Sequence, residues 1–369
     1  MWFKRMSLED WFDTWQYRTR YDVGESAVKF LKVADLGIDL SEVELRYGHH
    51  TGRPELRALA AEEYEGLTPS QVLVTSGAAE AIFAIVAAVA GPGDHVIVEH
   101  PNYPSTYDVP RGLGCEVGLL PLRFEDAFKP DLGRLAEMVT PRTKLIVFTH
   151  PNNPTGSMIS PEELASLVRF AEERRIYLLF DETYRHMAFG PPLPTAASLS
   201  PWAISVTSMS KCYGLPGIRI GWLATKAQAI LDGVLAVREQ VTITNTALSE
   251  TIATAVLRRR EEFLARGRSH VTANLRTVTS WMSTQSCLEW VPPEGGVVSL
   301  PRLREDAAVG DPEALYRKLA GDHQVFVIPG RCFELDNRFF RLGFGGTPAE
   351  LSIGLDRIAT ALRQAVTTA

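Results

Sequence analysis

The amino-acid sequence predicts an α/β fold, with a mostly parallel sheet flanked by helices and a smaller α+β domain. Two observations support this prediction. Between residues 72 and 224, short apolar runs typical of buried strands alternate with segments of helical periodicity. From about residue 226 the pattern becomes helical, and from about residue 290 short strands and helices are mixed. Ligands bind at the carboxyl ends of the strands in such a sheet, so functional side chains are expected there.

Composition limits the possible classes of protein. The 369 residues are 45% hydrophobic and 22% charged, which suits one large or two ordinary domains with a full core. The net charge of −6 gives no reason to expect a nucleic acid or an anionic membrane as a partner. No signal-peptide pattern is visible, and the most apolar segment, 81–90, is too short to span a bilayer. The four cysteines form no C-x-x-C pair, so we expect reduced thiols, a cytoplasmic protein and no metal site.

An amphipathic helix is expected over residues 7–17, with Ser7 as its N-cap. Apolar side chains recur there at helical spacing and form a docking face: Leu8, Trp11, Phe12 and Trp15. Glu9 lies on the opposite side of the helix from much of this stripe. It is therefore either solvated or turned towards a site. Residues 18–45 look irregular.

The first strand–helix pair follows a helix that begins at Pro54 and runs to about Glu65. The strand, 72–75, leads through Ser76, Gly77 and Ala78 into an apolar helix at 80–90. A glycine turn at a helix N-terminus points backbone N–H groups at an anion. The turn is therefore a candidate phosphate site, although many α/β turns look alike.

Three further strands, 95–99, 144–149 and 176–180, each end in a polar loop. The side chains of interest in these loops are His100, Tyr103, Asn153, Asp181 and Tyr184. A carboxylate at the end of a buried strand, such as Asp181, is costly unless a cation pairs with it. Without such a cation Asp181 would be a helix N-cap.

A lysine then separates two strands, 203–207 and 218–224. Lysine is seldom buried without a partner, and a desolvated amine gives up its proton more readily, which Schiff-base chemistry needs. The hydroxyls of Ser208 and Ser210 and the guanidinium of Arg219 could hold a phosphate beside Lys211. The alternative is a surface loop with a solvated lysine and arginine.

The C-terminal part is expected to contain strands at 297–300, 325–328 and 339–344 and helices at 311–320 and 347–366. Arg341 lies inside the last of these strands, where its charge needs an anion. A substrate carboxylate bound through two hydrogen bonds would satisfy it. Arg338 is the competing candidate, and an internal Asp or Glu partner is the alternative explanation.

The spacing Ser208-x-x-Lys211 with Arg219 eight residues later resembles the lysine segment of fold-type I pyridoxal-phosphate enzymes. These form the aspartate aminotransferase superfamily, or class I/II aminotransferases, whose large domain has a seven-stranded sheet. The run Asn153-Pro-Thr-Gly is similar to a specific landmark of the same family. The resemblance covers most of the chain, from Tyr47 to Arg341.

The resemblance implies pyridoxal 5'-phosphate as cofactor and gives roles to these residues. Lys211 would form the Schiff base, and Asp181 would pair with the pyridine nitrogen. The phosphate would be bound by Ser208, Arg219 and the turn Ser76, Gly77 and Ala78. Tyr103 would stack on the ring, with His100 as the fallback. The remaining implied contacts are those of Asn153 and Tyr184 with the phenolic oxygen, and of Arg341 and Asn153 with the substrate.

The family also implies a homodimer, because Tyr47 would reach the phosphate of the neighbouring subunit's cofactor. A tyrosine packed at a helix entry is the alternative reading of Tyr47. The domain division expected on this basis assigns residues 42–245 to the large cofactor-binding domain. Residues 1–41 and 246–369 would form an N-terminal arm and a small domain.

Three functions are compatible with these residues. An aminotransferase acting on an L-amino acid is the commonest outcome, with Lys211, Asp181 and Tyr103 as catalytic residues. The segment Leu8-Glu9-Asp10-Trp11 looks like the N-terminus of capreomycidine synthases, which cyclise a hydroxylated arginine in antibiotic biosynthesis. Glu9 would then bind a basic substrate. A pyridoxal-sensing regulator is the third, but only about 45 residues precede Tyr47, too few for the DNA-binding domain that such regulators carry.

Overall fold

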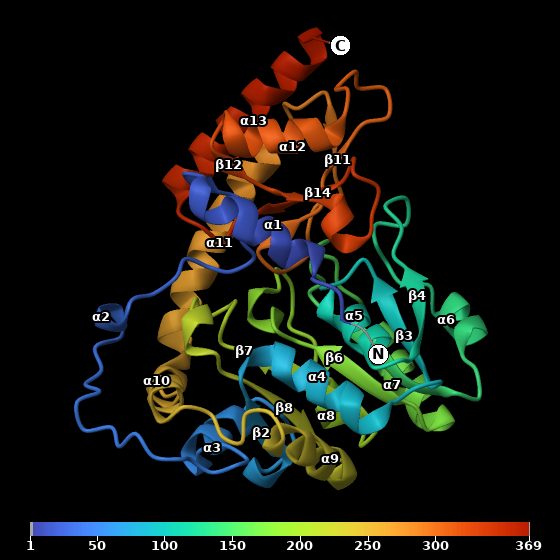
Figure 1. Cartoon of the computed structure of the whole chain (residues 1–369), viewed down its shortest axis with the longest axis vertical. Coiled ribbons are helices and arrows are strands. Elements are labelled where there is room, and N and C mark those ends of the chain that lie inside the picture. The colour runs from blue at the N-terminus through green and yellow to red at the C-terminus, as the bar shows by residue number, and fades with distance from the viewer. Residues whose placement is uncertain (1–2, 369) are drawn as a thin grey trace.

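The structure, a computed structural model, describes residues 3–368 and contains two layered parts (Figure 1). The larger part is built on a seven-stranded sheet of order β2-β8-β7-β6-β5-β3-β4. β8 runs antiparallel to both of its neighbours, and the other pairs are parallel. The strands are β2 Val72–Thr75, β3 His95–His100, β4 Glu116–Pro121, β5 Thr143–Thr149, β6 Tyr177–Asp181, β7 Ala203–Ser208 and β8 Gly221–Thr225.

Helices cover both faces of this sheet because successive side chains of each strand point to opposite faces. Val98 belongs to one apolar core with Ile82 of α4, whereas Ile97 belongs to a separate core with Leu164 of α7. The helices of this part are α3 Pro54–Ala61, α4 Gly77–Val89, α5 Ser105–Gly112, α6 Leu132–Met138, α7 Pro161–Arg174, α8 Ala196–Leu199, α9 Gln228–Glu239 and α10 Ala247–Leu257.

The smaller part combines short strands with three helices, and the long helix α11 runs up to it from the larger part (Figure 1). β14 lies between β10 and β13 in an antiparallel sheet, and β9 pairs with β11. Their bounds are β9 Leu288–Glu289, β10 Val298–Ser299, β11 Arg302–Leu303, β13 Ile328–Pro329, β14 Phe340–Gly343, α11 Arg260–Met282, α12 Pro312–Gly321 and α13 Pro348–Thr368.

The N-terminal arm packs on this smaller part, far from it in sequence (Figure 1). The short strand β1 (Tyr21–Asp22) pairs in parallel with β12 (Val325–Phe326). In helix α1 (Ser7–Trp15), the buried indole of Trp11 donates from Nε1 to the carbonyl of Val327 at 2.8 Å. The aromatic stripe is thus a docking face. The arm also contains a short helix, α2 (Val33–Leu36).

The comparison of elements confirms the fold class and corrects several details. Ser160 caps α7, since its Oγ accepts the N–H of Glu163 at 3.1 Å. Ser7 is not the N-cap of α1; the cap is Met6, because its carbonyl already accepts the N–H of Asp10. The elements not expected from the sequence are β1, α2, β4, α5, α6, α8, β9 and β11, and α3 ends at Ala61 instead of the expected Glu65.

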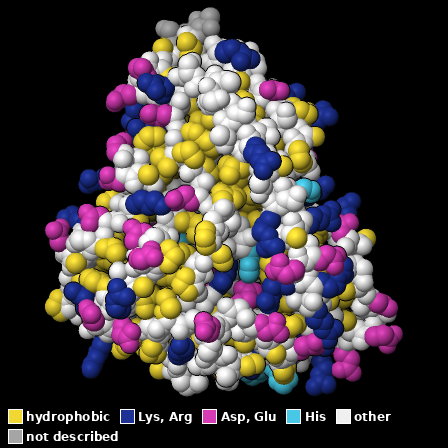
Figure 2. Space-filling view, turned by 180° about the vertical axis from the view of Figure 1, so that it is seen from behind, with side chains coloured by type: hydrophobic (Ala, Val, Ile, Leu, Met, Phe, Trp, Pro, Cys, Tyr) yellow, Lys and Arg dark blue, Asp and Glu magenta, His cyan; other side chains and the backbone are white. Residues whose placement is uncertain are grey.

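The surface is of mixed character. Figure 2 shows acidic and basic side chains interspersed on the rear face, with hydrophobic side chains gathered between them. Within residues 3–368, every helix is too short or too polar to cross a membrane. The proposed division at residues 41/42 and 245/246 stays a prediction.

Candidate active site

A cavity of about 310 Å³ lies where the carboxyl ends of the central strands meet the N-terminal arm. Three structural regions contribute its wall: the loops after β3, β5, β6 and β7, the start of α4, and the arm together with β14. Of the residues predicted to act, the lining includes Glu9, Ala78, Tyr103, Asn153, Asp181, Tyr184, Ser208, Lys211, Arg219 and Arg341.

One end of the cavity is suited to a phosphate group. The turn before α4 brings Gly77, with φ of +80°, so close to Arg219 that a Cβ atom would lie 2.7 Å from Nη2. Arg219 donates to the carbonyl of Ser76 and to Oγ of Ser210, each at 3.4 Å. Ser208 lies within the same lining. Backbone N–H groups, hydroxyls and a guanidinium therefore converge on one anion-binding position.

A buried carboxylate also lines the cavity. Asp181, the last residue of β6, is 5% exposed, and its Oδ1 accepts the N–H of Thr183 at 2.9 Å. Burial raises the pKa of the Asp181 carboxyl to about 6, although hydrogen bonds from Thr183 and the charge of Lys211 act in the opposite direction. A cation beside Asp181 would offset the free-energy cost of burying its negative charge.

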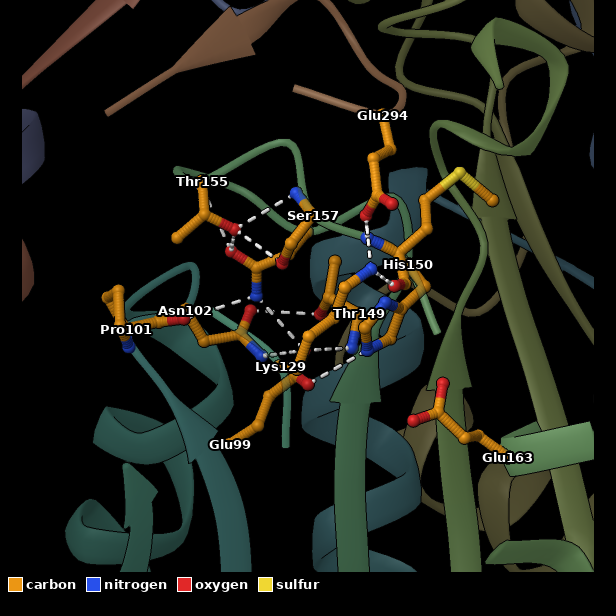
Figure 3. A network of polar contacts seen from close by, with 12 residues as sticks. Glu99, Pro101, Asn102, Lys129, Thr149, His150, Thr155, Ser157, Glu163 and Glu294 are labelled. Atoms are coloured by element: carbon orange, nitrogen blue, oxygen red, sulfur yellow. Dashed lines mark hydrogen bonds and ion pairs between the residues drawn. The ribbon is translucent and has the colours of Figure 1, made fainter. Parts of the chain in front are cut away.

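A polar network supports the loop behind this wall (Figure 3). Glu99, at 0% exposure, accepts the N–H of Thr149 at 2.6 Å and Nδ2 of Asn152 at 3.0 Å. Its second oxygen lies 3.0 Å from Nε2 of His150. Because every partner is buried, the network fixes the backbone that presents Asn153 to the cavity.

Lys211 projects from the loop after β7 and is held by the N-terminal arm. Its Nζ donates to Oγ of Ser26 at 3.0 Å and lies 3.3 Å from Oε1 of Glu25. Neither partner was expected from the sequence, because both lie in the irregular stretch of residues 18–45. Residues 21–28 mix polar and apolar side chains, so no local pattern marks Glu25 as a partner of Lys211.

Arg341 enters from β14 and is 1% exposed. It donates twice to the carbonyl of Gly24, at 2.8 and 3.2 Å, and once to Oδ1 of Asn153 at 3.1 Å. Burial lowers the pKa of the Arg341 guanidinium. Its neutral hydrogen-bond acceptors leave its charge able to attract a further anion. Arg338, the competing candidate, instead pairs with Asp336 and lies outside the cavity lining.

The remaining predicted residues divide between the cavity and the surface. Tyr103 lines the cavity, whereas His100 bonds the carbonyl of Phe333 at 2.8 Å and lies outside the lining. Tyr184 donates its hydroxyl to the carbonyl of Ser26 at 2.8 Å. Glu9 reaches the cavity from α1, although much of its side chain is exposed.

Tyr47 lies in a different hollow of the same chain and is 78% exposed. That hollow is formed with Arg53 and α10, including Ala247 and Thr251. The geometry of one chain therefore does not bring Tyr47 to its own cavity.

Comparison with known proteins agrees with this geometry. Residues 18–358 match the family described as aminotransferase class I and II. The chain belongs to this family. It is 30% identical to capreomycidine synthase of Streptomyces vinaceus, over 96% of this chain and 93% of the relative.

Two solved structures are also similar. A PLP-dependent aminotransferase from Streptococcus suis has a TM-score of 0.92 and 31% identity, covering 99% of each chain. The PLP-dependent cyclase OrfR has a TM-score of 0.91 and 29% identity, covering 99% of this chain and 98% of OrfR. The family, the fold and the pyridoxal-phosphate cofactor predicted from the sequence are thus confirmed.

The residues present fit this cofactor. The turn at Gly77 has no room for a side chain beside Arg219, which leaves its N–H groups accessible to a phosphate. Asp181 supplies a buried carboxylate for a protonated ring nitrogen. Lys211 places an amine in the same cavity.

The buried charge of Asp181 should lower the free energy of unfolding of the cofactor-free protein. Since the folded pKa of Asp181, about 6, exceeds the ordinary aspartate value of 3.8, stability is lost as pH rises between these values and stays lost above about pH 6. The loss corresponds to roughly 3 kcal/mol. Asp181→Asn should therefore make the cofactor-free protein more stable to urea at pH 8, with a gain that shrinks towards pH 4.

The same substitution should remove most turnover of the cofactor-loaded enzyme, because a neutral amide lacks the negative charge that keeps the ring nitrogen protonated. Urea unfolding and steady-state rates check the two effects separately. An Asp181→Asn protein that is no more stable at pH 8, or that retains wild-type rates, would contradict this role.

Proposed function

We propose that the chain catalyses an aminotransferase reaction on an L-amino acid, with Lys211 as the Schiff-base lysine. The observation that carries the proposal is the convergence of Lys211, Asp181 and Arg341 on one cavity. An amine, a buried carboxylate and a buried guanidinium are the groups required to bind pyridoxal phosphate covalently, to charge its ring and to hold an α-carboxylate.

The proposed binding roles follow from the donors and acceptors present. Arg219, Ser208 and the turn from Ser76 to Ala78 would hold the phosphate. Asp181 would pair with the ring nitrogen, and Tyr103 would contact the ring face. Asn153 and Tyr184 would donate to the phenolic oxygen, and Arg341 would bind the substrate carboxylate beside Asn153.

Lys211 would move the proton at the substrate α-carbon, first as a base and then as an acid. Its amine would be available for this role whenever it is not bound to the cofactor. Pyridoxal phosphate, when bound, supplies an electron sink for the negative charge that develops at that carbon. Arg341 would orient the α-carbon by fixing the carboxylate.

A second candidate is a cyclase or dehydratase acting on a hydroxylated arginine. Two observations favour it: Glu9 lines the cavity from α1, and the match to capreomycidine synthase covers nearly the whole chain. A carboxylate at the cavity would suit a guanidinium. Antibiotic biosynthesis would then be its setting. For either function we expect a cytoplasmic enzyme, in keeping with four unpaired cysteines.

The test is to add candidate amino acids to the cofactor-loaded enzyme and identify the products. A keto acid together with the amine form of the cofactor means transamination. Loss of water with ring closure on a hydroxylated arginine means the second function. Absence of both products across basic, acidic, aromatic and aliphatic substrates would overturn the proposal.

Lys211→Ala should abolish turnover and the visible imine absorption, because the amine that forms the Schiff base is gone. Lys226→Ala is the matched control, since Lys226 donates to the carbonyl of Ser198 outside the cavity. It should keep both properties. Visible spectroscopy and borohydride trapping measure the imine directly. Persistent imine absorption and activity in Lys211→Ala would disprove the assignment.

We propose that the enzyme is a homodimer in which Tyr47 serves the partner's cofactor. Exposed apolar side chains near Tyr47 support an interface: Leu45 is 79% and Leu248 is 39% exposed. Light scattering should give twice the chain mass of 40.8 kDa. Tyr47→Phe should weaken cofactor binding and leave the dimer intact. Tyr17→Phe is the control, because Tyr17 is 87% exposed, and it should change neither cofactor binding nor the dimer. A fully active monomer would rule out this arrangement.

Glu9→Gln discriminates between the two candidate functions. If Glu9 pairs with a basic substrate in a closed site, the change should cost on the order of 2–4 kcal/mol, the range for breaking a desolvated charge pair. That is a fall of tens- to several hundred-fold in kcat/KM for arginine-like substrates, with little effect for neutral ones. Asp10→Asn is the control, because Asp10 pairs with Arg5 away from the cavity. Equal, unaffected kinetics with both substrate types would leave the plain aminotransferase.

A further inference from the structure

Glu25 is the carboxylate nearest the Lys211 amine, at 3.3 Å from Nζ. It follows β1, which belongs to the smaller part, whereas Lys211 follows β7 of the large sheet. The ion pair therefore joins the arm to the catalytic lysine. Both side chains are partly covered, with exposures of 21% for Glu25 and 27% for Lys211.

The position of the Glu25 carboxylate is fixed independently of Lys211. Oε1 accepts the N–H of Ser26 at 2.8 Å, and Oε2 accepts Nε2 of Gln16 at 3.2 Å. Gln16 also donates to Oδ2 of Asp22 at 2.9 Å, which fixes the orientation of its amide. Because both oxygens accept hydrogen bonds, the carboxylate keeps its position whether Nζ of Lys211 is a free amine or part of an imine.

The carboxylate also stays charged. Burial alone would raise the pKa of Glu25, but the charges of Lys211 and Arg341 and the N–H of Ser26 hold it below its usual range. A permanent negative charge at this distance stabilises the positively charged form of the neighbouring nitrogen.

We propose that Glu25 is a positioning residue that holds the Lys211 nitrogen in the cavity and keeps it positively charged at neutral pH. The inference rests on the proposed role of Lys211 as the Schiff-base lysine. A protonated imine is the form that a substrate amine attacks, since the positive charge draws electrons from the imine carbon. Glu25 would thus act through Lys211 and would not itself touch the reacting carbon.

Other charged and titratable groups also face Lys211, from each element that packs around it. Arg341 from β14 and Arg219 from the loop before β8 oppose a positive nitrogen, whereas Asp181 at the end of β6 favours one. The remaining groups on the lining or just behind it are Glu9 of α1, Asp22 of the arm, Tyr103 and Tyr184. Of the carboxylates, Glu25 alone among the described residues forms an ion pair with Nζ.

The test is a pH titration of the visible imine absorption in the cofactor-loaded wild type and in Glu25→Gln. Glutamine preserves the shape of the side chain but removes its charge. The pH midpoint should fall by about 1 pH unit, the lower end of the range for an opposite charge within 4–6 Å, because both side chains are partly exposed. Borohydride trapping with mass spectrometry should show equal cofactor occupancy in both proteins.

Glu294→Gln is the matched control, since Glu294 pairs with Lys129 outside the cavity (Figure 3). Its midpoint should equal that of the wild type. Glu25→Asp keeps the charge and should move the midpoint less than Glu25→Gln, which separates charge from shape. An unmoved midpoint in Glu25→Gln at full occupancy would overturn the inference. The Lys211 assignment fails independently, if Lys211→Ala keeps the imine absorption.

Discussion

Charge held out of water at the carboxyl edge of the large sheet is the constraint on which this site depends. Asp181 and Arg341 are buried to 5% and 1% exposure, yet their hydrogen bonds go mainly to neutral groups. An ion pair between them would have satisfied both and left neither able to bind a ligand. Instead each charge is tolerated at a cost, and a cofactor and a substrate of opposite charge would offset that cost.

The large sheet makes this arrangement possible because its parallel strands end at a common edge. The loops after them are braced from behind, most visibly by Glu99, which holds Thr149 and Asn152 with direct hydrogen bonds. A rigid rear wall keeps the backbone of this loop fixed, so the placement of Asn153 does not depend on a mobile loop. Glycine at position 77 adds a backbone conformation that other residues rarely adopt, beside Arg219.

The small part and the N-terminal arm complete the site from the other side. β1 pairs with β12, and Trp11 anchors α1 to Val327. These contacts bring Glu9, Glu25 and Ser26 to the same side of the site as Arg341. The groups proposed to bind the cofactor thus come mainly from the sheet, whereas those proposed to lie near the substrate come from the arm and from β14. The two sets are linked, because Glu25 and Ser26 of the arm contact Lys211, and Arg341 of β14 donates to Asn153.

The sequence alone determined the fold class, the family and the residues that follow the central strands. This was possible because strand alternation and the spacing of Ser208, Lys211 and Arg219 are local patterns, which one stretch of chain can encode. Tertiary structure decided the rest. The sequence favoured Arg341 over Arg338, and the structure shows that β14 places Arg341 in the cavity lining while Arg338, which precedes the strand, lies outside it. The contact of Glu25 with Lys211 joins residues 186 positions apart, so no local pattern carries it; it exists because β1 pairs with β12 and brings the arm over the sheet edge.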